Sequence, residues 1–193
     1  MPGMKGRESG MPAEGCWEEF FDAAGIVARL GCAARPGEVV EFGCGYGTFS
    51  LPAARELDGV FHAMDIDPAM VARTAARARA EGVTNLRAAV RDIAADGTGL
   101  PDGAAVHAML FNLLHIENPV GLLREALRVL GPGGSASVIH WRSDIETPRG
   151  PPPEIRPPPE QCARWAEEAG FRSVRILPFD GVAPWHFGLV AEK

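Results

Sequence analysis

A glycine-rich stretch from Glu41 to Gly47, EFGCGYG, has the residue types and spacing of a ligand-binding loop. It follows a short apolar run, and glycines after a strand let the backbone approach a ligand closely. The spacing of Gly43, Gly45 and Gly47 is G-x-G-x-G, so the third glycine comes one residue too early for the dinucleotide fingerprint G-x-G-x-x-G. The Glu41 carboxylate would repel a pyrophosphate and attract a ligand that carries an ammonium and a sulfonium group. The loop therefore predicts a cationic small-molecule ligand.

Two aspartates follow the next two apolar runs of the chain. Asp65 comes eighteen residues after Gly47, at the end of the second run, where a carboxylate can accept both hydroxyls of a ribose. Asp92 ends the third run, within plausible reach of an adenine amino group. Because the carboxyl ends of parallel strands meet at one edge of a sheet, we expect both carboxylates beside the glycine loop.

To bring these residues together at one edge of a sheet, the chain must alternate strands with helices. Short β-branched or apolar runs predict strands, and apolar residues at steps of three and four predict helices. Asn118 and Pro119 are a typical cap and first-turn pair. The pattern predicts an α/β fold with a doubly wound, mostly parallel sheet. We expect strands at 38–42, 60–64, 86–90, 104–111 and 135–141, and helices at 48–57, 68–81 and 119–130.

Both ends of the chain depart from this alternation. We expect residues 1–15 to be a disordered lead-in and 16–193 to be one domain, which begins with an amphipathic helix over 16–30. The aromatic side chains of that helix, Trp17 among them, could cover a ligand cleft or simply pack against the sheet.

The C-terminal part begins with a proline-rich stretch. Residues 148–159 hold seven of the 17 prolines and predict an extended loop, which is either a spacer or the edge of a lid. A helix over 160–169 comes next. Strands at 174–177 and 185–190 should then form an antiparallel hairpin at one edge of the sheet.

Composition and charge exclude several classes of protein. The chain has 46% hydrophobic and 23% charged residues and lacks an apolar stretch of membrane-spanning length, so we expect a soluble protein. The net charge of −6 disfavours binding to nucleic acid. Four cysteines without a CxxC pair suit reduced thiols in a cytoplasm, and we expect no metal site.

The motifs EFGCGYG, AMDID, RDI, LFNLLH and RVLGPGG resemble the class I S-adenosylmethionine-dependent methyltransferases, in the broad type 11 group, over residues 38–141. The chain end resembles uncharacterised bacterial methyltransferases of this size. The resemblance implies a Rossmann-like, seven-stranded sheet that ends in the antiparallel hairpin, and S-adenosyl-L-methionine as cofactor. It implies these cofactor contacts: Glu41, Gly43, Gly45 and Gly47 at the methionine end, Asp65 at the ribose, Ile66, Asp92 and Ile93 at the adenine, and Asn112.

Methyl transfer from a sulfonium is an in-line displacement, so a general base is needed only where the acceptor starts out protonated. Candidate catalytic residues lie after the fourth and fifth predicted strands: His115, His140 and Arg142, with Asp144 nearby. Each of them could equally be a loop histidine or a solvent-facing charge. His107, in mid-strand, is better interpreted as a core residue.

Several acceptor classes can be argued against. The tetrapeptide NLLH, which begins at Asn112, lacks the paired prolines of enzymes that methylate adenine or glutamine. Cys162 follows a glutamine, so it is not part of the Pro-Cys pair of enzymes that methylate cytosine. A small-molecule acceptor remains. The alternative is a catalytically silent module that binds S-adenosylmethionine without turnover, because the cofactor residues fit both functions.

Overall fold

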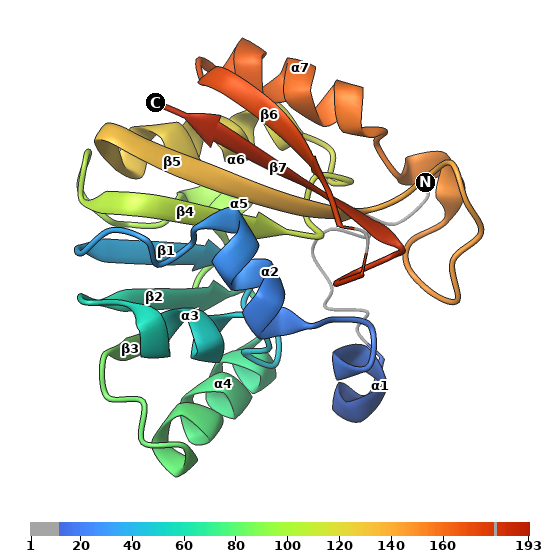
Figure 1. The fold of residues 1–193 in the computed structure, drawn as a ribbon. Helices are drawn as coiled ribbons and strands as arrows, with labels where there is room; N and C mark the ends of the chain where they lie inside the picture. The colour runs from blue at the N-terminus through green and yellow to red at the C-terminus, as the bar shows by residue number, and fades with distance from the viewer. Residues whose placement is uncertain (1–11, 180) are drawn as a thin grey trace.

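The structure, a computed structural model, describes residues 12–179 and 181–193. A seven-stranded sheet with the order β3-β2-β1-β4-β5-β7-β6 forms its centre (Figure 1). Strands β1 to β5 pair in parallel, and β7 runs antiparallel to both β5 and β6, which confirms the predicted sheet and its C-terminal hairpin. The strands are β1 (Glu38–Phe42), β2 (Phe61–Asp65), β3 (Leu86–Val90), β4 (Ala105–Phe111), β5 (Leu130–Trp141), β6 (Arg172–Pro178) and β7 (His186–Glu192).

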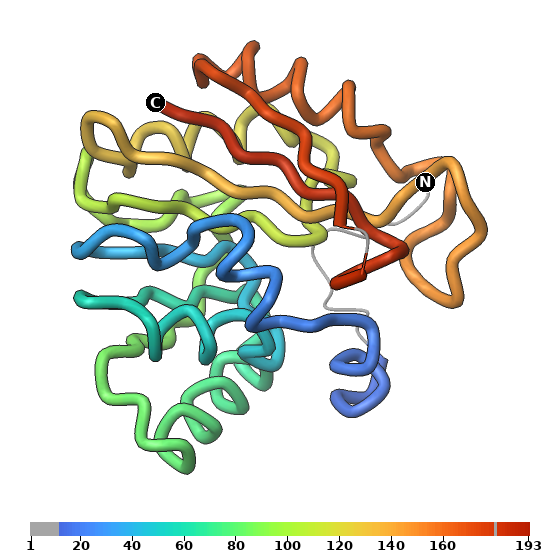
Figure 2. The backbone as a smooth tube through the Cα atoms, viewed as in Figure 1, coloured from blue at the N-terminus to red at the C-terminus, as the bar shows by residue number. Residues whose placement is uncertain are grey.

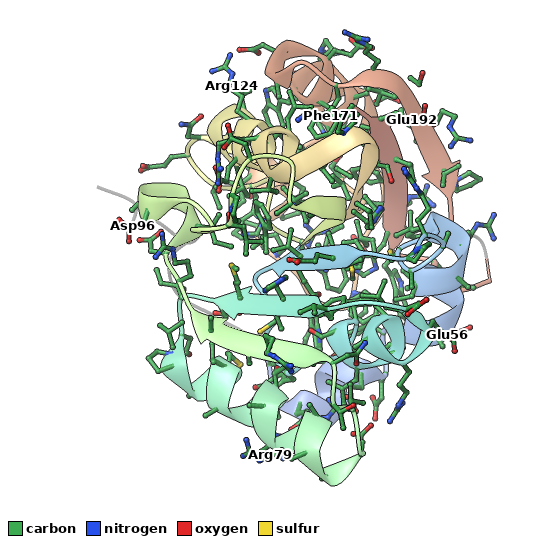
Figure 3. All side chains as sticks on the ribbon, turned by 90° about the vertical axis from the view of Figure 1, so that its left-hand side faces the viewer. Glu56, Arg79, Asp96, Arg124, Phe171 and Glu192 are labelled. Atoms are coloured by element: carbon green, nitrogen blue, oxygen red, sulfur yellow. The ribbon has the colours of Figure 1, made fainter. Side chains whose placement is uncertain are left out.

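Helices cover both faces of the sheet and bury a separate apolar core on each. Helices α5, α6 and α7 pack on one face and α2, α3 and α4 on the other, so neighbouring strand residues such as Val39 and Val40 enter different cores. In Figure 1, α2 lies in front of the sheet and α6 behind it. Charged side chains such as Arg79 project outward, whereas Phe171 is buried (Figure 3). The helices are α1 (Glu14–Glu18), α2 (Ala23–Leu30), α3 (Ser50–Glu56), α4 (Pro68–Ala80), α5 (Ile93–Asp96), α6 (Pro119–Val129) and α7 (Pro159–Ala169), with a short 3-10 helix, η1 (Pro153–Ile155).

Local signals start helices α4 and α6, which pack on opposite faces of the sheet. The Asp67 side chain accepts a hydrogen bond from Ala69 N at 2.8 Å, and the Asn118 side chain accepts one from Gly121 N at 2.9 Å. A proline in the first turn follows each cap. These caps fix where the chain leaves the sheet.

The strand order reverses beside β1. This strand lies between β2 and β4, so the chain winds outward in both directions from it. The crevice at the carboxyl ends of β1 and β4 is the topological switch point, where open α/β sheets bind their ligands. In Figure 2, α1 in blue and the orange loop after β5 both lie at that end of the sheet.

The prediction of a single helix over residues 16–30 is wrong, because the structure has two helices there. Helix α1 ends at Glu18 and α2 begins at Ala23, where the Asp22 side chain caps it by accepting from Gly25 N at 3.0 Å. Phe20 and Phe21 lie in the break and pack on aromatic rings distant in sequence, at centroid distances of 5.7 Å to Trp185 and 4.9 Å to Phe49. Tertiary packing outweighs the helical periodicity at this point.

Other boundaries also differ. Strand β5 begins at Leu130, five residues earlier than predicted, because the glycine-rich turn continues into the sheet. Of the predicted lead-in, residues 1–11 lie outside the described residues, while Glu14 and Gly15 form the first turn of α1 and are ordered by Glu14 pairing with Arg73. Within the described residues, no helix is long and apolar enough to cross a bilayer.

Candidate functional site

A cavity of about 660 Å³ opens at the carboxyl ends of the strands. The cavity walls include most of the residues that sequence reasoning selected: Glu41, Gly43, Gly45, Asp65, Ile66, Asp92, Ile93, Asn112 and His115. Volumes of this size hold cofactors and drug-sized ligands. The roles of these residues toward a ligand stay predictions, but the structure brings them together.

The glycine loop is pinned to the end of β2. Gly43 N and Cys44 N both donate to Met64 O at 2.8 Å, and Gly45 N donates to Asp65 Oδ2 at 2.8 Å. Gly47 does not line the cavity. Its φ is +79°, and a Cβ there would lie 2.6 Å from Leu51, so this glycine serves the turn and its packing.

Glu41 is a buried carboxylate on the cavity wall. It is 1% exposed and accepts a hydrogen bond from the Ser50 hydroxyl. Burial raises the pKa of Glu41 to about 8, with the Ser50 hydrogen bond lowering it and the nearby Asp65 carboxylate adding to the rise. Among the described residues no Lys, Arg or His forms an ion pair with it. A cationic ligand in the cavity would therefore favour the ionised form of this carboxyl.

Asp65 anchors the loop and also faces the cavity. Its Oδ1 accepts from Asp67 N at 2.9 Å and its Oδ2 from Gly45 N, while burial raises the pKa of the carboxyl. Each carboxylate oxygen has a second acceptor site, so both can still accept from a ligand hydroxyl. Ile66, the next residue, adds apolar surface.

Asp92 and Ile93 form the wall beyond β3. The Asp92 side chain caps α5 by accepting from Ala95 N at 3.1 Å, so its capping role and its place on the cavity coexist. Ile93 is 9% exposed and joins the core beneath α6 while it lines the cavity. Together they present an apolar patch with one carboxylate beside it.

Two polar side chains on the wall lack partners. The Asn112 amide nitrogen and oxygen and the Thr48 hydroxyl are buried without a hydrogen bond among the described residues. Asn112 also has a φ of +58°, and its backbone N donates to Ile139 O at 2.7 Å, which holds the Asn112 backbone in place. A buried unpaired polar group costs about 1–3 kcal/mol. Ligand atoms in the cavity would supply the missing partners.

Aromatic side chains line the other end of the cavity. They are Trp17 from α1, Phe49, Phe111 and Trp141. Their side chains make this part of the cavity apolar, and of the four only Trp17 is predicted from the sequence to cover a ligand. A signal was available for Phe111 and Trp141, because both are the last residues of predicted central strands.

The proline-rich loop closes the same end. Residues 149–152 line the cavity, which favours the lid-edge interpretation over a simple spacer. The buried Arg156 holds the loop by donating to Pro151 O at 2.7 Å, Thr147 Oγ1 at 2.7 Å and Arg142 O at 3.0 Å. Its guanidinium also lies 5.8 Å from the Trp141 ring centroid. The loop is thereby fixed against the aromatic wall.

The three candidate catalytic residues have different positions. His115 lines the cavity, and His140 lies behind it, fully buried, with its Nε2 3.2 Å from His115 Nδ1. Arg142 does not line the cavity, because its guanidinium pairs with both Asp144 oxygens at 2.9 and 2.7 Å at the surface. The structure thus leaves one of the three in position to touch a ligand.

Comparison with known proteins agrees with this geometry. A family described as "Methyltransferase domain" matches residues 39–134. The methyltransferase tpcH of Aspergillus fumigatus is 32% identical over 118 residues, which are 56% of this chain and 40% of that protein's length. An S-adenosylmethionine-dependent methyltransferase structure from Aquifex aeolicus has a TM-score of 0.79 at 24% identity, with 90% of each chain covered.

The fold is that of class I S-adenosylmethionine-dependent methyltransferase structures. Residues 39–134 of the chain match the methyltransferase domain family. The same fold also occurs in a solved structure of the [4+2]-cyclase SpnF, with a TM-score of 0.73 at 19% identity, covering 97% of this chain and 84% of that one. The activity must therefore be argued from the site.

Proposed function

We propose that the protein transfers a methyl group from S-adenosylmethionine to a small-molecule acceptor. The observation that carries the proposal is a cavity with buried carboxylates, Glu41 and Asp65, at the ends of β1 and β2, and with aromatic side chains at the ends of β4 and β5. One end suits a polar, cationic cofactor and the other an apolar acceptor. The curated relative that carries the name methyltransferase supports the reaction class.

The residues on the wall fit this cofactor. Glu41 would hold the cationic methionine end together with the backbone of Gly43 and Gly45, and Asp65 would accept from the ribose hydroxyls. Ile66, Ile93 and Asp92 would contact the adenine, and the unpaired amide of Asn112 would gain partners. The cofactor supplies an activated methyl group on a sulfonium.

The protein itself aligns the reacting groups and excludes water from them. An in-line displacement depends on holding the acceptor atom and the methyl group in line, which can supply much of the rate enhancement. Trp17, Phe49 and Trp141 exclude water from the acceptor end. The loop held by Arg156 completes that enclosure.

Radiolabelled S-adenosylmethionine and a panel of small-molecule acceptors test the proposal. We expect transfer of label to at least one acceptor, and loss of that transfer in Asp65→Ala. The alternative, a module that binds the cofactor without turnover, predicts cofactor binding by calorimetry with no labelled product from any acceptor. That outcome would contradict the proposed reaction.

A further inference from the structure

Two histidines form a hydrogen-bonded chain that leads from the cavity into the protein. His115 Nδ1 lies 3.2 Å from His140 Nε2, and His140 Nδ1 lies 3.2 Å from Trp141 O. Nε2 of His115 has no hydrogen-bond partner among the described residues, and His115 lines the cavity. The chain therefore runs from a backbone carbonyl, through His140, to a ring nitrogen at the cavity.

The carbonyl determines where each proton lies. Because Trp141 O can only accept, Nδ1 of His140 must carry the hydrogen. A neutral His140 then has a lone pair on Nε2, so it accepts from Nδ1–H of His115. A neutral His115 is left with its lone pair on Nε2. This order of protons is the one that gives His115 a basic nitrogen at the cavity.

The surroundings keep both rings neutral. Burial, together with the His115 ring and the Arg156 guanidinium, lowers the pKa of His140 to about 3. Burial also lowers the pKa of His115. His186, on the neighbouring strand β7, has its pKa lowered to about 3 by burial, by His140 and by Arg156, so it is neutral as well. None of these groups supplies a proton to Nε2 of His115 near neutral pH.

We infer that His115 Nε2 accepts the proton of a hydroxyl-bearing methyl acceptor, and that His140 is a positioning residue that fixes the His115 tautomer. The inference rests on the proposed function. The acceptor O–H bond breaks with its electron pair kept by oxygen, and an N–H bond forms at Nε2. The imidazolium later returns this proton to solvent.

The cavity favours a hydroxyl over other protonated acceptors. The cavity that His115 lines also has apolar side chains, among them Leu113, Ile116 and Trp141, and burying an ammonium against them would cost far more than burying a hydroxyl. A thiol, with an ordinary pKa of about 8.5, ionises with less help than a phenol at about 10. The aromatic walls further suit a flat ring, so phenols are the acceptor class that this base fits.

The tautomer can be measured without any acceptor. In protein labelled with nitrogen-15 histidine, long-range proton–nitrogen spectra should show His115 as the Nδ1–H tautomer in the wild type, with and without S-adenosylhomocysteine. His140→Phe should convert it to a mixture or to Nε2–H, and His140→Gln, whose side-chain oxygen can accept from Nδ1–H, should restore it. His115 found as Nε2–H in the wild type, or unchanged in His140→Phe, overturns the inference.

A second histidine gives the matched control. His107 is equally buried and contacts Ser135 and Ser137 through its two ring nitrogens, each at 2.8 Å, away from the cavity. His107→Gln should leave the His115 tautomer and S-adenosylhomocysteine affinity unchanged. S-adenosylhomocysteine binding that His140→Phe retains shows that this variant is folded. A wild type that binds the cofactor but methylates no acceptor contradicts the proposed function, whereas a wrong His115 tautomer in an active enzyme contradicts only the inference.

The acceptor class is tested with phenols against tertiary anilines, which have no proton to lose. We expect methylation of phenols, a fall in kcat of roughly 100-fold or more for His115→Ala and about tenfold for His140→Phe, and partial rescue by His140→Gln. The acid limb of kcat against pH should shift in His140→Phe, because the charged His115 loses its acceptor. Turnover of the anilines alone, or of no phenol, overturns the acceptor assignment.

Discussion

At the scale of single residues, the site depends on buried carboxylates without cationic partners. Glu41 and Asp65 lie on one wall, and neither forms an ion pair with a described Lys, Arg or His. Burying charge without a partner is costly, and such groups are concentrated at functional sites. Their position is best explained by a cationic and hydroxyl-bearing ligand.

Asp65→Ala should weaken S-adenosylhomocysteine binding by roughly 10- to 100-fold, because two ribose hydroxyls lose a charged acceptor. Calorimetry measures the change, and Asp58→Ala, on the surface away from the cavity, is the control. Thermal unfolding of Asp65→Ala should be measured alongside, since Asp65 also accepts from two backbone N–H groups and its loss could affect stability. An unchanged dissociation constant in a folded variant would refute the ribose contact.

Binding of S-adenosylmethionine should release a proton from Glu41. Its pKa is about 8 in the free protein, so the carboxyl is mostly protonated at pH 7, and a bound cation favours the ionised form. Affinity should therefore rise between pH 6 and pH 8. Calorimetry in buffers of different ionisation enthalpy gives the number of protons, and Glu41→Gln should abolish the release. Proton uptake, or a pH-independent affinity, would contradict this assignment.

At the scale of elements, α1 and the proline-rich loop enclose the acceptor end, but they are held differently. The loop is fixed by Arg156 from within, whereas α1 is held by ion pairs of Glu14 and Glu18 with Arg77, at 3.1 and 2.6 Å. No residue of α1 is buried, while α2 buries Ile26, Val27 and Leu30. Helix α1 is therefore the segment suited to open and close.

Arg77→Ala should loosen α1, which Arg73 still holds through Glu14, and raise the S-adenosylhomocysteine dissociation constant by about two- to fivefold, as expected for loss of partly exposed ion pairs. Hydrogen exchange should show residues 14–18 gaining protection with ligand, while 23–30 stay equally protected. Arg55→Ala, which removes a surface pair with Glu81, is the control. Equal protection of residues 14–18 in both states would make α1 a fixed part of the scaffold.

Most strands and helices could be predicted because their signals are local. Asp67-Pro68 and Asn118-Pro119 mark helix starts within two residues, and the apolar run of β4 is continuous. The break between α1 and α2 could not be predicted, because Phe20 is drawn to Trp185, which is far away in the sequence. The position of His140 behind His115 likewise depends on how β5 packs beside β4.

At the scale of the whole molecule, three buried histidines and the half-buried His115 should make stability depend on pH. Burial lowers the pKa of His107 to about 4 and of His140 and His186 to about 3, and it also lowers that of His115. Such groups stabilise the fold above their unfolded pKa near 6.5, and this contribution is lost as the pH falls toward the folded values. The raised pKa values of Glu41 and Asp65 act in the opposite direction.

The free energy of unfolding should therefore fall between pH 6.5 and pH 4, by up to roughly 1.4 kcal/mol per pH unit for each histidine that titrates on unfolding. Urea unfolding at several pH values measures this slope. His107→Gln should reduce the slope of the unfolding free energy against pH by the contribution of about one proton. A free energy that stays constant from pH 7 to pH 4.5 would show that these histidines are not kept neutral by the fold.

The central claim, that the cavity is a methyltransferase cofactor site, is tested most directly by calorimetric titration of S-adenosylhomocysteine and NAD into the same protein. The account predicts saturable one-to-one binding of S-adenosylhomocysteine. It predicts no detectable binding of NAD at micromolar concentration, because Glu41 opposes a pyrophosphate and the glycine spacing does not fit one. Saturable NAD binding, or no binding of S-adenosylhomocysteine, would contradict it.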